Sequence, residues 1–494
     1  MIRVTLLLVL FSACGSPSTP DASVDLTKDI QGDFIDRFTL PDGSVLEGTL
    51  DVTALTVSAF SDSDDGGFEV RSATGRSGGR FVLQNVPQGR YSLAAATTII
   101  STEQRETHFG QNRLGRPLAQ LANPGEGYRI TATNLAPWHV EDEVQFFSWN
   151  AGIGFFSTSQ RDFSTHRPDA GQTTLSQAFI DFGGVSAPET AQGDWLTVTQ
   201  LHVEPLDSGV LLKMARRTAT VQKSLLVGTQ TSLNLDFTEP APDTATLGVQ
   251  RDQFTPFLAE MGFGATLISN RVGLSAHPGS FDFTVSDGTP DLMLAEFSLD
   301  AGLTSVTGTF GNVFPQPAFQ HFVSGGIAAE VSYSLPTDAG RSLPRSEVAT
   351  VSTVLTRAAA ANQPLAPLIS PVKNVKLDGA ALFTSAVVPT GVTPTLTWEK
   401  PTLGTLTRTD IDVFELSVSP QTGGTNRLVA GSIKVLGDAT RFHVPPGVFV
   451  AGRFYVLRIT AIFAPRLEVT APLRQPGPPV GTASTLTAVI AVHE

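Results

Sequence analysis

Short stretches in which apolar and polar residues alternate recur along this chain, with Gly- and Pro-containing turns between them. The clearest are residues 52–60, 128–133, 395–399 and 455–461. Because successive side chains of a strand point to opposite faces, such stretches predict strands with one apolar face. The 45 Gly and 33 Pro residues suit many turns, and helical periodicity is scarce. We therefore expect an all-β chain of several consecutive antiparallel β-sandwich domains.

The composition indicates a folded, acidic protein. Hydrophobic residues make up 41% of the 494 residues, which is enough to fill cores and excludes wholesale disorder. Asp and Glu number 46 against 33 Lys and Arg, so the formal net charge is −13. A chain this acidic repels phosphate backbones, and we expect no nucleic-acid partner.

The first residues have the pattern of an export signal. Arg3 precedes an apolar run over residues 4–11, and the small residues Ser12 and Ala13 follow. The run is too short to span a bilayer as a helix, which takes about 20 residues. Cys14 comes next and is the only cysteine, so an internal disulfide is excluded.

Residues 11–15, Phe-Ser-Ala-Cys-Gly, resemble the lipobox of bacterial lipoproteins. The resemblance implies a signal peptide over residues 1–13, cleavage before Cys14, and fatty acyl chains such as palmitate on that cysteine. The membrane is then a partner, through a lipid anchor at Cys14. Gly15 differs from the Asp that commonly retains lipoproteins at the inner membrane, which favours the outer membrane. The alternative is an ordinary signal peptide with an incidental cysteine.

The rest of the chain divides into a tether and four folded units. Residues 14–33 are rich in Ser, Pro and Asp and have no apolar period, so we expect a flexible tether. Pro-containing segments at 239–243 and 363–367 indicate boundaries. The expected units are residues 34–105, 106–240, 241–368 and 369–494.

The unit over 34–105 contains a motif around one turn. Its residues are Gly79, Phe81, Leu83, Val86, Pro87, Gly89, Tyr91 and Leu93. The motif resembles that of carboxypeptidase regulatory-like domains, which are small transthyretin-type β-sandwiches. That family's module is non-catalytic, so the resemblance implies a structural or binding role.

Four carboxylates cluster before the second strand of this unit. They are Asp62, Asp64, Asp65 and Glu69, and together they are candidates for a calcium site. Their spacing fails the EF-hand template, because Gly66 stands where the third ligand belongs. A solvated acidic turn is the simpler interpretation.

The middle of the chain, residues 106–368, carries aromatic and imidazole side chains: Trp138, Trp149, Trp195, His108, His139, His166, His202, His277 and His321. One hypothesis is an aromatic ligand platform, or a metal site near His139, Glu141, Asp142 and Glu143. The simpler interpretation is core tryptophans and scattered surface histidines, since the sequence has no His-x-x-x-His or His-Glu-x-x-His spacing. Residues 273–277 begin like a nucleophile elbow but end in His, and we expect a loop there.

The unit over 369–494 has short alternating strands throughout. An early Trp398 precedes two alternating stretches, Phe414-x-Leu416-x-Val418 and Tyr455-x-Leu457-x-Ile459-x-Ala461. The unit resembles a fibronectin type III domain, and Tyr455 matches that family's buried tyrosine near the start of strand F. Domains of this family act as spacers or bind partners, and they rarely catalyse.

The sequence identifies no active site. It has no Gly-x-Ser-x-Gly, Walker A or Gly-x-Gly-x-x-Gly motif behind a strand, and we expect no cofactor. We therefore expect a non-enzymatic envelope lipoprotein whose sandwiches bind a glycan or surface-protein partner, or act as a spacer. An envelope hydrolase with its active site in 106–368 is the alternative, because such enzymes carry accessory domains of this kind.

Overall fold

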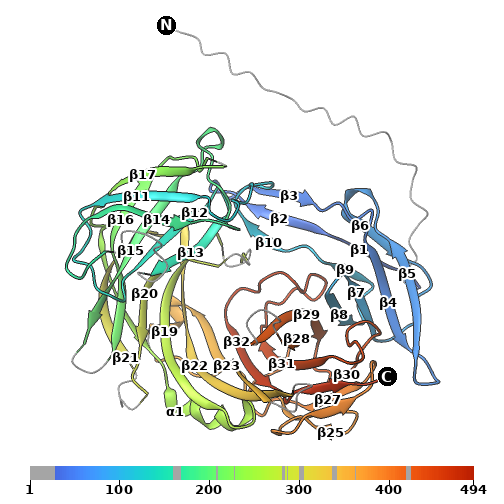
Figure 1. Ribbon diagram of the computed structural model, residues 1–494. Helices are drawn as coiled ribbons and strands as arrows, with labels where there is room; N and C mark the ends of the chain where they lie inside the picture. The colour runs from blue at the N-terminus through green and yellow to red at the C-terminus, as the bar shows by residue number, and fades with distance from the viewer. Residues whose placement is uncertain are drawn as a thin grey trace.

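The computed structural model describes residues 28–159, 168–206, 210–226, 228–280, 284–285, 288–299, 305–336, 342–361, 363–418 and 424–494. These residues are almost entirely strands and loops (Figure 1). The α-helices among them are two single turns, α1 (Arg251–Phe254) and α2 (Arg357–Ala360). The prediction of an all-β chain is confirmed.

One hydrogen-bonded ladder links eighteen strands of the described residues. They are β4 (Thr56–Asp62), β5 (Phe68–Thr74), β7 (Tyr91–Ala95), β8 (Thr98–Thr102), β12 (Glu143–Ser148), β13 (Ile153–Ser159), β15 (Leu196–Pro205), β16 (Leu211–Val221), β19 (Thr266–Pro278), β20 (Asp291–Glu296), β22 (Phe319–Pro336), β23 (Ser342–Thr356), β26 (Val388–Thr390), β28 (Arg408–Val418), β29 (Thr425–Leu436), β31 (Phe454–Phe463), β32 (Val480–Leu486) and β33 (Ile490–Val492). In Figure 1 the ladder runs round the molecule, from β12 through β19, β22 and β23 to β28, and on to β8 and β4.

The remaining strands form five smaller sheets, most of which pack on the ladder as a second layer. The sheets are β6 (Arg80–Leu83), β1 (Ile30–Asp33) and β9 (Glu106–His108); β10 (Asn112–Leu114), β2 (Ile35–Thr39) and β3 (Val45–Thr49); β14 (Leu175–Asp181), β11 (Gly127–Thr133) and β17 (Gln230–Asp236); β18 (Pro242–Gly248) and β21 (Ser305–Gly311); and β25 (Ala380–Ala381), β24 (Lys373–Leu377), β27 (Thr395–Glu399) and β30 (Arg441–His443). The molecule is thus a row of β-sandwiches that share one long sheet.

The alternation in the sequence explains this layering. Along β17 the residues are exposed and buried in strict turn, and Thr231, Leu233 and Leu235 face inward. The two leucines join a core cluster with Tyr128 of β11 and Phe146 of β12. Each side chain of this kind stabilises the fold by about 1.5–3 kcal/mol when it leaves water.

The carboxy-terminal unit is a two-layer sandwich. Strands β24, β27 and β30 form one layer, and β29, β28, β31 and β33 lie in the other. Trp398 is buried between them, and Tyr455 is fully buried, with its hydroxyl accepting a hydrogen bond from the N–H of Val450 at 3.1 Å. The burial of Tyr455 that the resemblance implied is observed, and Trp398 is buried as well. The unit is a β-sandwich, and its resemblance to fibronectin type III domains stays a prediction.

The motif of the amino-terminal unit lies in its core. Phe81, Leu83, Tyr91 and Leu93 are all buried in one cluster, which β6 and β7 supply from the two layers. Gly89, in the turn between them, has a φ of +104°, a conformation that favours glycine. The resemblance to carboxypeptidase regulatory-like domains stays a prediction.

Strand pairing joins units that are far apart in the sequence. Strand β8 of the first expected unit pairs in parallel with β29 of the last, from Thr98 opposite Ser432 to Ser101 opposite Val435. Strand β23 pairs with β32 in the same ladder. Leu365, in the segment expected to be a linker, is buried in the main core. The division of the chain into units stays a prediction.

The prediction of a loop at residues 273–277 is wrong. These residues belong to strand β19, which pairs with β20 on one side and β22 on the other. Nearly every residue from Val272 to Pro278 is buried, so both faces of the strand are covered. A strand buried on both faces lacks the alternation that marks a half-exposed one.

Candidate functional site

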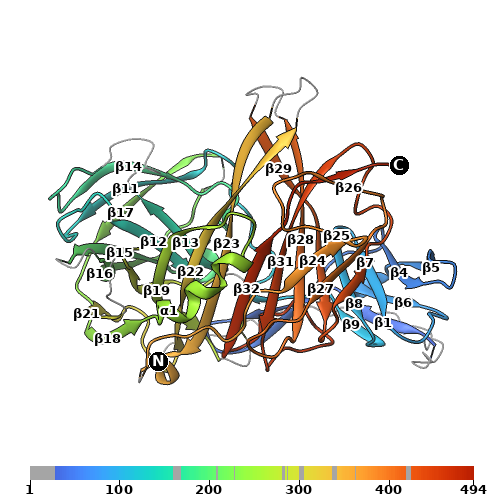
Figure 2. The same ribbon diagram turned by 90° about the horizontal axis from the view of Figure 1, so that it is seen from below.

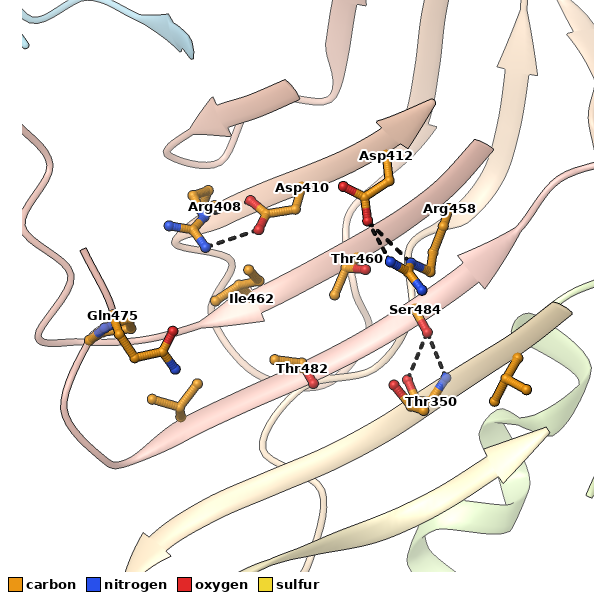
Figure 3. Close-up of a pocket in the computed structure, with 13 residues that line it drawn as sticks. Thr350, Arg408, Asp410, Asp412, Arg458, Thr460, Ile462, Gln475, Thr482 and Ser484 are labelled. Atoms are coloured by element: carbon orange, nitrogen blue, oxygen red, sulfur yellow. Dashed lines mark hydrogen bonds and ion pairs between the residues drawn. The ribbon is translucent and has the colours of Figure 1, made fainter. Parts of the chain in front are cut away.

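A polar groove lies on one face of the carboxy-terminal part of the ladder (Figure 3). Strands β28, β31, β32 and β23 line it, and its volume is about 310 Å³. Because side chains alternate along β28, Arg408, Asp410 and Asp412 share this face. Ile411 and Val413, on the opposite face, are buried in the core.

Ion pairs between neighbouring strands organise the groove. Arg458 of β31 lies opposite Asp412 and donates to its Oδ2 from Nη2 at 2.7 Å and from Nε at 3.2 Å. Arg408 donates from Nη2 to Asp410 Oδ2 at 2.9 Å, and Lys434 Nζ of β29 donates to the same oxygen at 2.9 Å. Three cations and two carboxylates therefore meet on this face, so this group of five side chains has one excess positive charge.

The two arginines are held on their other sides as well. The guanidinium of Arg458 lies 5.2 Å from the ring centre of Phe414, within range of a cation–π contact. Arg408 is buried and also donates to the carbonyl oxygen of Pro472, in the loop that supplies Gln475 and Pro476 to the groove wall. The charged groups are thus fixed in place before any ligand arrives.

The groove opens where two strands separate. The ladder between β23 and β32 ends with Val351 opposite Ala483. At the next position the hydroxyl of Ser484 accepts from the N–H of Thr350 at 2.6 Å and donates to its carbonyl at 3.1 Å (Figure 3). A side chain thus replaces a strand partner, which satisfies the backbone of β23 while β32 moves away.

Two long hairpins project past the groove. Figure 2 shows the ends of β22–β23 and β28–β29 extending beyond the rest of the molecule. Glu347 of β23 holds them together, since it pairs with Arg427 of β29 and accepts from Arg345 at 3.1 Å. Aliphatic residues on these hairpins face solvent: Val348 is 42%, Val418 41%, Leu428 65% and Val429 51% exposed.

This arrangement suits binding better than proton transfer. Asp410 and Asp412 are each paired with cations, and the Ser432 hydroxyl also donates to Asp412 at 3.2 Å. A general acid or base needs a proton that it can exchange at the working pH. Fixed, paired charges instead offer a pattern of donors and acceptors that a partner can match.

The four calcium candidates do not converge. Asp62 pairs with His443 at 2.8 Å, and Asp65 accepts hydrogen bonds within its own turn, from Ser63 and from the N–H of Gly67. The Ser63 hydroxyl lowers the pKa of Asp65. Glu69 pairs with Arg71. Among the described residues, no group of three His, Cys, Asp or Glu side chains is placed to hold a metal ion.

In the acidic segment near His139, one carboxylate lies in the interior and has a structural role. Asp142 is fully buried and accepts from Gln200 at 2.9 Å and from the N–H of Val203 at 2.8 Å. Its Oδ2 also lies 2.9 Å from His202 Nδ1. Glu143 pairs with Lys213 on the neighbouring strands. These bonds bring distant loops and strands together within one sandwich.

Two histidines expected at the surface are buried, and that expectation is wrong for them. His277 accepts from the N–H of Val285 at 3.2 Å, and burial lowers its pKa to about 4. His321 Nε2 lies 2.9 Å from the carbonyl of Phe314. A neutral imidazole with a hydrogen-bond partner is tolerated in a core. His166 lies outside the described residues.

The three middle tryptophans separate into two environments. Trp138 is buried in a core cluster, as the simpler interpretation expected. Trp149 and Trp195 line one cavity, together with the turn between β2 and β3. The sequence marked these tryptophans as candidates, and the structure brings two of them together.

Cys14 lies outside the described residues, so its lipidation stays a prediction. In the part of the chain that the structure describes, no helix has the length and apolar character needed to cross a bilayer.

The groove residues were not singled out from the sequence. Arg408, Asp410 and Asp412 alternate with apolar residues, which is the ordinary pattern of a solvent-facing strand surface. Arg458, the partner of Asp412, is 46 residues further along the chain, and only the register of β28 and β31 brings the two charges together. The sequence signal for the groove was the presence of charged residues at every second position of this strand.

No protein-family model and no curated protein matches the chain. Among solved structures, the FN1–FN3 domains of chicken CNTN1 are 10% identical, with 75% of this chain and 100% of that chain covered and a TM-score of 0.13. A tetra-tandem repeat from the extending region of a large adhesion protein is 11% identical, with 93% and 98% covered and a TM-score of 0.12. At these TM-scores the likenesses do not establish a shared fold.

Proposed function

We propose that this chain is a non-enzymatic outer-membrane lipoprotein, anchored through Cys14, that binds a protein partner with its carboxy-terminal groove and hairpins. The observation that carries the proposal is the preformed row of Arg–Asp pairs beside two projecting hairpins with exposed aliphatic residues. An all-β chain of this kind is compatible with a binding or spacer module.

The chemistry of this surface supports a protein partner. Protein interfaces combine an apolar centre with a polar rim, and they are enriched in arginine. Leu428 and Val429 offer apolar area, while Arg458 and Asp412 offer matched donors and acceptors nearby. Water-exposed aliphatic residues on a projecting hairpin gain free energy when a partner covers them.

Photocrosslinking in intact cells tests the proposal. A photoreactive residue at position 428 is expected to give one discrete protein adduct, while the same residue at Leu118, which is 92% exposed, gives none. The double variant Asp412→Asn/Arg458→Gln removes both charges without leaving either unpaired, and it is expected to reduce the adduct severalfold. Equal crosslinking at both positions, or an adduct unaffected by the double variant, would refute the proposed surface.

The anchor is tested separately. The intact mass of the amino-terminal peptide, from membrane-extracted protein, is expected to show acyl chains on Cys14. Cys14→Ala is expected to lose both that mass and membrane association. An unmodified terminus on a membrane-free wild type would show that the lipobox pattern is incidental.

A further inference from the structure

We propose that the cavity lined by Trp149 and Trp195 is a second binding site, which takes a pyranose ring of a glycan. The cavity has a volume of about 440 Å³, within the range of small-molecule sites. The turn between β2 and β3, the end of β12 and the start of β15 form its walls. It shares no lining residue with the groove of Figure 3.

Trp149 is a fixed wall of this cavity. Its indole N–H donates to the carbonyl of Thr39 at 2.9 Å. The ring of Phe319 contacts it edge-on, with ring centres 5.3 Å apart. An indole held by a hydrogen bond and a ring contact loses little further freedom when a ligand packs against it.

Trp195 is the exposed wall. It is 53% exposed, an unusual state for the largest apolar side chain, since burying such a ring is strongly favourable. The residues on either side of it are buried: Asp194 and Leu196 are both at 0% exposure. The backbone is therefore anchored while the indole is left for a ligand.

The buried side chain of Asp194 fixes the backbone next to Trp195 through several hydrogen bonds. Its carboxylate accepts from Asn150 at 2.8 Å, from the N–H of Glu189 at 2.8 Å and from Arg116 at 3.2 Å. Asn150 is itself a lining residue of the cavity. A buried carboxylate with these donors positions Trp195 and Asn150 relative to each other, as a preorganised site requires.

Polar groups at the cavity match the edge of a sugar. Asp42 and Thr197 line it beside the two indoles. The Ser44 hydroxyl donates to Asp42 at 2.6 Å and lowers the pKa of that carboxyl, so it stays an acceptor. A pyranose has C–H faces that pack on aromatic rings and hydroxyls around its rim that donate to carboxylates. Two indoles with a carboxylate and an amide at their margin fit that amphipathic shape.

Fluorescence titration of the purified chain from residue 15 tests the site. The probes are oligosaccharides from peptidoglycan, from lipopolysaccharide cores and from chitin, with tetramethylammonium as a non-sugar cation that also binds indoles. At least one oligosaccharide is expected to quench tryptophan emission saturably. Trp195→Ala is expected to weaken that binding by about tenfold or more. Asp42→Asn keeps the shape of the turn and is expected to weaken it severalfold.

Matched variants keep the test decisive. Phe263 is 52% exposed and lies outside the cavity, so Phe263→Ala is expected to bind the oligosaccharide as the wild type does. Trp195→Phe keeps an aromatic face and is expected to retain part of the binding, even if the alanine variant folds poorly. Crosslinking at position 428 is expected to be unchanged in Trp195→Ala. The proposed sugar site and the proposed protein-binding surface are therefore tested independently of each other.

Three results would overturn the sugar site. The first is the absence of binding by every oligosaccharide at millimolar concentration. The second is equal affinity of the wild type, Trp195→Ala and Asp42→Asn for the same oligosaccharide. The third is binding of tetramethylammonium alone, which would make the cavity a cation site.

Discussion

Asp291, at the start of β20 in the ladder, is a carboxyl group that is hydrogen-bonded to a glutamine side chain. Its N–H donates to Gln145 Oε1 at 3.0 Å, and Gln145 Nε2 lies 3.4 Å from its Oδ2. Burial, together with the neighbouring charge of Glu143, raises the pKa of Asp291 to about 7 from 3.8. The folded chain therefore holds this proton more tightly than the unfolded chain does.

Asp291→Asn is expected to change how stability depends on pH. Because the unfolded carboxyl loses its proton near pH 3.8 and the folded one near 7, the wild type loses stability as pH rises through this window. Asn mimics the protonated form, so the variant and the wild type are expected to match at about pH 4 and below. At about pH 8 the variant is expected to be more stable, by up to about 4 kcal/mol, because folding raises the pKa from 3.8 to about 7. Urea unfolding at the two pH values measures this, and a difference that does not vary with pH would contradict it.

One side chain, that of Glu347, links the two projecting hairpins. Glu347 is nearly buried and receives Arg345 and Arg427, which come from different hairpins. Arg345 also donates to the carbonyl of Thr425 at 2.7 Å. Among the described residues of the two hairpins, side chains make this link and no strand ladder joins β23 to β29.

Glu347→Gln is expected to release the hairpin ends from each other. Two guanidinium groups lose their shared carboxylate, which costs about 1–3 kcal/mol locally. Hydrogen exchange is expected to speed up in residues 342–350 and 424–431, while β11, in a different sandwich, keeps its protection. Unchanged exchange in both hairpins would show that Glu347 does not hold them.

At the scale of elements, the sequence was informative where one face of a strand is apolar and the other polar. Strands β11, β27 and β31, at the alternating residues 128–133, 395–399 and 455–461, were predicted for this reason. Strand β19 was missed because both its faces are buried. The groove was missed because it exists only when β28, β31 and β32 take one particular register, which no local pattern encodes. The pairing of Trp149 with Trp195 depends in the same way on where two separate loops meet.

The whole molecule is held together by pairings between distant segments. The parallel pairing of β8 with β29 joins the first and last parts of the chain. His443 adds a contact at this junction, because it pairs with Asp62 at 2.8 Å and stacks on Phe68 with ring centres 4.1 Å apart. These contacts could not be predicted from the sequence, because the residues of a strand do not indicate which distant strand it will pair with.

This continuity predicts joint unfolding of the first and last expected units. A ladder shared by two units couples their stabilities, whereas units joined only by a linker unfold independently. Scanning calorimetry of the chain from residue 15 is expected to show no separate transition for residues 34–105. Arg90→Ala removes a donor to the Leu436 carbonyl at the junction, and is expected to lower the shared transition by a few degrees. Two resolved transitions that each match an isolated unit would contradict the coupling.

The central claim is that the hairpins and groove form a binding surface for a protein, and the most direct test is an equilibrium affinity. The partner identified by crosslinking at position 428 is titrated against the purified chain by calorimetry. The account predicts that Leu428→Ser/Val429→Ser weakens binding by about tenfold or more, while the control Leu118→Ser, at an even more exposed leucine outside the surface, leaves it unchanged. Equal affinity of the hairpin variant and the wild type, with both fully folded, would contradict it.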